Sequence, residues 1–135
     1  MVIWRAAIWI LANWPSAVGR RVLKLIIAYV RPEKLRDVKT SLSKVEVFRM
    51  SIDNVRTTGD EPAVRESYRG ADVYVDTHAR VKFEIAVNDE FVDRAVNAII
   101  DAGRTGIDGD GHILVVPIER SIRIRDGAEA GEAIA

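Results

Sequence analysis

Apolar residues recur along this chain with the spacings of strands and helices. Runs typical of strands are Lys24–Val30, Val47–Arg56, Val73–Val87, Ile113–Ile118 and Ser121–Arg125. The third run alternates most regularly, with Val81, Phe83, Ile85 and Val87 on one face. Helical spacing connects two other sets, which are Leu35, Val38, Leu42 and Val45, and then Val92, Ala95, Val96, Ile99 and Ile100.

The order of these elements, β-α-β-β-α-β, predicts an α+β fold with ferredoxin-like topology. Four strands with both helices on one face leave the other face of the sheet bare. If that face is apolar it must be covered, and oligomerisation is the simplest cover.

The stretch Thr57–Asp72 shows no apolar period and holds Gly59, Pro62 and Gly70 among mixed charges. It predicts a loop of roughly 16 residues between the second and third strands. Compact domains rarely keep so long a loop without a function.

Composition limits the classes of function. The chain has 135 residues, of which 48 % are apolar, enough for one packed domain. Its 20 basic and 20 acidic side chains balance, whereas a dedicated nucleic-acid binder carries a basic excess. Cysteine is absent and only two histidines occur, so disulfides are excluded and a histidine-rich metal site is disfavoured. These features fit a cytoplasmic protein.

Residues 1–22 stand apart from the predicted domain, residues 23–135, which ends in a small, polar C-terminal tail. The segment holds all three tryptophans, but its apolar run is too short for a membrane-spanning helix. It fits an interfacial amphipathic helix, and a signal peptide only faintly. The alternative is that it lies upstream of a start at Val22 or Leu23, whose codons can be GTG or TTG.

A glycine-rich stretch, Thr105–His112, lies between the second helix and the fourth strand. Glycines let successive amides approach an anion. Arg123 and Arg125 follow, and period-two spacing predicts that both guanidinium groups lie on one face. Together they suit a polyphosphate, although an ordinary connecting loop is the alternative.

From Lys24 onward the chain resembles the PII nitrogen-regulatory signal proteins. The matching motifs are Ile26-Ile27-Ala28-Tyr29-Val30-Arg31-Pro32, Tyr68-Arg69-Gly70-Ala71-Asp72, Val81-Lys82-Phe83-Glu84, Arg104-Thr105-Gly106, Gly109-Asp110-Gly111 and Ile122-Arg123-Ile124-Arg125. The resemblance implies a homotrimer that binds ATP or ADP between subunits, with Mg²⁺ as a candidate co-ligand. It also implies a regulator, not an enzyme, whose long loop reaches a partner such as an ammonium transporter or a nitrogen-metabolism enzyme.

The resemblance assigns roles residue by residue. Ser51 stands where the family contacts adenine, and Glu84 where it binds ribose from the neighbouring subunit. The other nucleotide-binding positions that it implies are Gly59, Thr105, Gly109, Asp110, Gly111, His112, Arg123 and Arg125.

Several positions depart from the family pattern. Glu61 replaces the glutamine that coordinates Mg²⁺ and 2-oxoglutarate, and Arg80 replaces the lysine that holds a 2-oxoglutarate carboxylate. His112 replaces a lysine. Val73 and Ala71 stand where other members carry a uridylylated tyrosine and a phosphorylated serine, so we expect no modification there.

These departures keep alternatives open. One is a PII-like sensor of another metabolite, for example one linked to bicarbonate, without a response to 2-oxoglutarate. Another is an enzyme or metal-tolerance protein on a similar trimeric scaffold, which no nucleophile–base pair supports. We expect a cytoplasmic regulator that reaches a membrane only through its partner.

Overall fold

The computed structural model describes residues 22–59, 64–75 and 77–129. The predictions for residues 1–21 and for Glu61 lie outside the described residues and stay predictions.

The predicted α+β fold is confirmed. Its elements are β1 (Leu23–Val30), the 3₁₀ turn η1 (Pro32–Lys34), α2 (Leu35–Lys44), β2 (Ser51–Thr57), β3 (Val64–Tyr68), β4 (Ala71–Val75), β5 (His78–Asn88), the 3₁₀ turn η2 (Asp89–Phe91), α3 (Val92–Gly103) and β6 (Ile113–Ile118). One antiparallel sheet has the strand order β2-β5-β1-β6, which is the ferredoxin-like order. A second sheet is the hairpin β3-β4.

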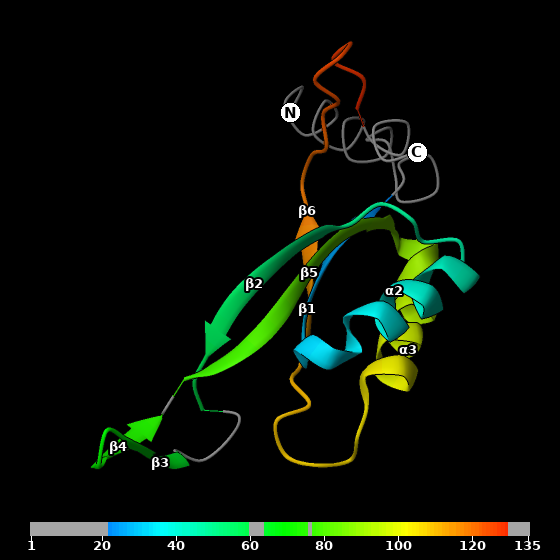
Figure 1. Cartoon of the computed structure of the whole chain (residues 1–135). Coiled ribbons are helices and arrows are strands. Elements are labelled where there is room, and N and C mark those ends of the chain that lie inside the picture. Colours follow the sequence, from blue (N-terminus) through cyan, green and yellow to red (C-terminus); the bar gives the residue numbers. More distant parts are fainter. Residues whose placement is uncertain (1–21, 60–63, 76, 130–135) are drawn as a thin grey trace, which may run out of the picture.

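Helices α2 and α3 lie against one face of the four-stranded sheet (Figure 1). Cross-strand partners point to the same face, so Ile26 pairs with Ile85 and Ala28 with Phe83 beneath the helices. All four are fully buried, as are Val38 and Leu42 of α2. Burying each large apolar side chain here stabilises the folded domain by about 1.5–3 kcal/mol. The packed core thereby holds β1 and α3 in place, and the glycine-rich loop Thr105–His112 follows the end of α3.

No helix of the described residues lies on the opposite face of the sheet (Figure 1). Its apolar members from β1 and β6 are Leu25, Ile27, Leu114, Val116 and Ile118, which we call the uncovered face. Leu114 is 46 % exposed and Val116 is 40 % exposed. The condition left open by the sequence, that the bare face is apolar, is therefore met.

The predicted strand Val73–Val87 and the predicted loop Thr57–Asp72 were partly wrong. The predicted loop contains β3 and the start of β4. The two strands are joined by Arg69 and Gly70, both with positive φ, which is the geometry of a two-residue hairpin turn. The long strand is divided into β4 and β5, and Figure 1 shows the hairpin projecting beyond the helices. The second strand also starts later than predicted, at Ser51.

No helix within the described ranges is long and apolar enough to cross a bilayer.

Candidate functional site

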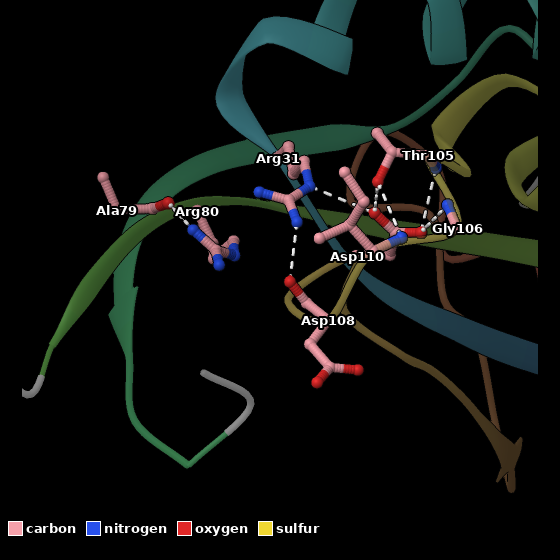
Figure 2. Close-up of polar contacts among 8 residues, drawn as sticks. Arg31, Ala79, Arg80, Thr105, Gly106, Asp108 and Asp110 are labelled. Carbon is pink, nitrogen blue, oxygen red and sulfur yellow. Dashed lines mark hydrogen bonds and ion pairs between the residues drawn. The ribbon is translucent and has the colours of Figure 1, made fainter. Parts of the chain in front are cut away.

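The glycine-rich loop between α3 and β6 is organised around the carboxylate of Asp110 (Figure 2). Its Oδ2 accepts the backbone N–H groups of Thr105 and Gly106, each at 2.9 Å. Its Oδ1 accepts the Thr105 hydroxyl and the Nε–H of Arg31, the latter at 3.0 Å. Asp110 therefore closes the loop on itself.

Arg31, directly after β1, ties this loop to the sheet. In addition to its Nε bond to Asp110, Arg31 donates from Nη2 to the carbonyl oxygen of Asp108 at 2.8 Å. The Thr105 hydroxyl, the loop amides and Arg31 hold the pKa of Asp110 well below its ordinary value. The sequence reasoning missed Arg31 as a site residue, and a charged side chain at the end of a buried strand was the signal available.

His112 lies at the end of the loop, against Tyr29 of β1. Its carbonyl oxygen accepts the Tyr29 N–H at 3.0 Å, and the two rings lie 5.0 Å apart. A cavity of about 420 Å³ opens beside them, lined by Tyr29, Ile99, Gly103, Arg104, Asp110 and His112. The loop thus presents amides and an exposed imidazole next to an apolar hollow.

Ser51 and Glu84, predicted to contact the adenosine part, are cross-strand partners on β2 and β5. Both line a second cavity of about 480 Å³, together with Leu25, Met50, Ala86 and Ser121. The Glu84 carboxylate pairs with Lys82 Nζ at 3.0 Å, and this hydrogen bond raises the pKa of Lys82. Ser51 and Glu84 therefore lie side by side on neighbouring strands of one copy, and their predicted contacts with adenine and ribose stay predictions.

The predicted strand Ser121–Arg125 is not formed. After Ser121 the chain makes an isolated bridge between Ile122 and Glu129, with a turn at Ile124–Asp126. Asp126 causes the turn, because its Oδ1 accepts the Ala128 N–H at 3.0 Å while Gly127 N–H donates to the Arg123 carbonyl at 2.8 Å. The prediction that Arg123 and Arg125 share a strand face was wrong.

The two arginines instead converge on Asp126. Arg123 donates from Nε and Nη2 to the two carboxylate oxygens, at 3.0 and 2.7 Å. Arg125 Nη2 lies 4.0 Å from Oδ2, and its side chain is 77 % exposed. The Arg123 bonds lower the pKa of Asp126, so the carboxylate is ionised at neutral pH.

The glycine-rich loop and the two arginines lie at opposite ends of β6 (Figure 1). The loop precedes Ile113, and the arginines follow Ile118 by five residues or more. At about 3.4 Å per residue the strand alone separates them by about 17 Å. A single phosphate chain therefore cannot contact both groups on one copy of this protein.

Other predicted site residues lie outside these two groups. Gly59 follows β2 with φ +93°. Arg80 is buried on β5 and donates from Nη1 to the Ala79 carbonyl at 2.7 Å (Figure 2). Ala71 and Val73, the positions where other family members are modified, belong to β4. Among the described residues no group of three His, Asp or Glu side chains could hold a metal ion.

Comparisons with known proteins agree on one family. The model of the family described as "Nitrogen regulatory protein P-II" matches residues 23–128. The chain is 39 % identical to the nitrogen regulatory protein GlnK2 of Haloferax mediterranei, over 91 % of this chain and 98 % of that one. It is 46 % identical to the nitrogen regulatory protein P-II of Haemophilus influenzae, over 83 % of this chain and all of that one.

Proposed function

The chain belongs to the P-II (PII) family of nitrogen regulatory proteins, and we propose that it acts as a homotrimeric sensor of ATP and ADP. By its family it is a signal-transduction regulator and not an enzyme. Beyond the family, the proposal concerns which ligand the protein binds, how its subunits assemble and which proteins it regulates.

The observation that carries the proposal is the separation of the glycine-rich loop from Arg123 and Arg125 along β6. Two groups suited to phosphate lie about 17 Å or more apart on one copy, so one nucleotide can use both only between copies. The uncovered face supplies an apolar surface for such an assembly. Both features support a site shared by neighbouring subunits.

In this arrangement one subunit provides the loop and its neighbour provides the other half of the site. The amides of Gly109 and Gly111, with His112 and the Thr105 region, would face the phosphates, and Gly59 would approach from β2. Ser51 and Glu84 of the neighbour would hold adenine and ribose, while Arg123 and Arg125 would pair with phosphate oxygens.

The signal would pass through the segment between β2 and β5. Gly59 is close in sequence to the β3-β4 hairpin, which projects away from the helices. A nucleotide that contacts Gly59 differently in its ATP and ADP forms shifts the population of hairpin positions. The hairpin would then dock on, or release, an ammonium transporter or a nitrogen-metabolism enzyme.

The test combines calorimetry with subunit mixing. Titration of ADP and of ATP into the wild-type trimer should give saturable heat. An arginine-defective variant, R123A with R125A, and a loop-defective variant, H112E, should each lose most binding while the oligomer persists.

When the two defective variants are unfolded and refolded together, mixed trimers contain intact sites. In these sites the arginine-defective subunit supplies the loop and the loop-defective subunit supplies the arginines. Recovery of part of the ADP binding is the expected result. If the mixture binds no more ADP than either variant alone, the shared site is wrong.

A further inference from the structure

The segment after β6 carries its own anion for the two arginines of the proposed site. Arg123 and Asp126 form a two-pronged pair at 3.0 and 2.7 Å, and this geometry resembles the grip of a guanidinium group on a phosphate. Asp126 also lies within 4.0 Å of Arg125. One carboxylate therefore occupies the Arg123 donors that phosphate oxygens would take, and its negative charge lies close to Arg125.

The backbone holds this carboxylate in place. Arg123 N–H donates to the Ala128 carbonyl at 2.8 Å, and Ala128 N–H donates to Asp126 Oδ1 at 3.0 Å. Farther out, Arg120 pairs with Glu129 at 2.5 Å. Asp126 is thus tethered three residues from Arg123 in a closed turn, which gives it a high effective concentration at the guanidinium group.

We propose that Asp126 is an internal competitor for phosphate, which a bound nucleotide must displace from Arg123 before the site can close. This inference rests on the proposed nucleotide site. It assigns Asp126 a role in setting the affinity and in rejecting ligands without phosphate groups. A ligand with several phosphate charges displaces one carboxylate, whereas a weakly charged ligand leaves the internal pair intact.

The side chain of Arg123 is 29 % exposed and that of Asp126 is 43 % exposed. Solvent screens such a pair, so the effect of the competition on affinity is moderate. We expect D126N to bind ADP about fivefold more tightly than the wild type. Asn keeps an oxygen that accepts the Ala128 N–H, so the turn is retained and the arginines are not left without their backbone support.

The matched control is E129Q, which removes a carboxylate from the same segment but from Arg120 instead of the site arginines. Calorimetry of ADP on the full chain should show tighter binding by D126N and unchanged binding by E129Q. The advantage of D126N should shrink as ionic strength rises, because salt screens the internal pair that it removes. Adenosine, which has no phosphate, should bind wild type and D126N equally.

The outcomes separate the two proposals. Equal or weaker ADP binding by D126N would mean that Asp126 orients Arg123 for the ligand, and the competition would be wrong while the nucleotide site stands. Equal tightening of adenosine and ADP would also overturn the competition, because adenosine displaces no carboxylate. If neither the wild type nor D126N binds ADP or ATP, the proposed function fails, and the competition fails with it.

Discussion

A Cβ atom built on Gly111 would lie 1.9 Å from the carbonyl oxygen of Tyr29, so the loop and β1 meet backbone to backbone. Gly111 also has φ +95°, which costs other residues about 1–2 kcal/mol. Only glycine fits this contact without moving the loop or the strand.

We therefore expect G111A to lower the free energy of unfolding by at least about 2 kcal/mol, since strain and a backbone clash add. The matched control is G106A, at φ +84° with no atom within 4 Å of its added Cβ, which should cost only about 1 kcal/mol. Urea unfolding measures both. Equal losses in the two variants would show that the Tyr29 contact is unimportant.

The Asp110 carboxylate should contribute stability that depends on pH. Its pKa is lower in the folded than in the unfolded chain, so the unfolded chain binds more protons as the pH falls below about 4. The contribution is then full near neutral pH and is lost progressively in acid. D110N, which weakens the bonds to Arg31 and the loop amides, should cost about 1–3 kcal/mol at neutral pH.

Unfolding of wild type and D110N is compared at neutral pH and at pH values below about 4. The difference between the two proteins should shrink in acid. D108N is the control, because the contact of Asp108 with Arg31 uses its backbone carbonyl. A difference between D110N and wild type that stays constant with pH would contradict the assignment.

A ribose contact from Glu84 predicts a dependence on the sugar hydroxyl. E84Q should bind ADP about tenfold more weakly, since a hydrogen bond to a charged group contributes about 1.5–3 kcal/mol. The same change should matter little for 2′-deoxy-ADP if the carboxylate accepts the 2′-hydroxyl. Calorimetry measures the affinity of wild type and E84Q for both nucleotides. If E84Q loses the same affinity for ADP and for 2′-deoxy-ADP, Glu84 acts through Lys82 or the sheet and not through the ribose.

If the uncovered face forms the trimer interface, one charged substitution on it should disrupt the trimer. V116D places a carboxylate among Leu25, Leu114 and Ile118, where an apolar interface cannot solvate it. Light scattering should give a trimer for the wild type and smaller species for V116D, with ADP binding lost as well. T40D, on the exposed side of α2, should leave the trimer intact, and a V116D trimer would refute the interface.

We predict that 2-oxoglutarate binds weakly or not at all. Glu61 brings a negative charge to the position of a neutral amide in the family, and two like charges 4 Å apart repel by about 4 kcal/mol at an effective dielectric of 20. Titration into MgATP-loaded protein should give little heat for wild type and measurable heat for E61Q. E46Q is the control, and tight wild-type binding would contradict the prediction.

Sequence reasoning found the main sheet because its signals are local. The alternation around Phe83 and the helical spacing of Val38 and Leu42 follow directly from which side chains are buried. The β3-β4 hairpin was missed because its strands carry charges and its turn begins with Arg69, a residue that rarely takes positive φ.

The site was harder to predict because its contacts are distant or compete with one another. Arg31 meets Asp110 across 79 positions of sequence, which no spacing rule connects. Near Arg123 the sequence analysis followed the strand pattern and did not consider the Asp126-Gly127 pair. A turn formed there because Asp126 satisfies the Arg123 side chain and the Ala128 amide together. The glycine signal in Gly109–Gly111 identified the loop, but not which residue braces it.

The placement of the loop and the arginines at opposite ends of β6 has a genetic consequence. In a closed ring of three copies, each subunit would belong to two sites, one through its loop and one through its arginines. One subunit with a defective loop would inactivate one of the three sites in its ring. One subunit defective in both the loop and the arginines would inactivate two of the three sites. Such a double allele would act as a dominant inhibitor when expressed beside the normal gene.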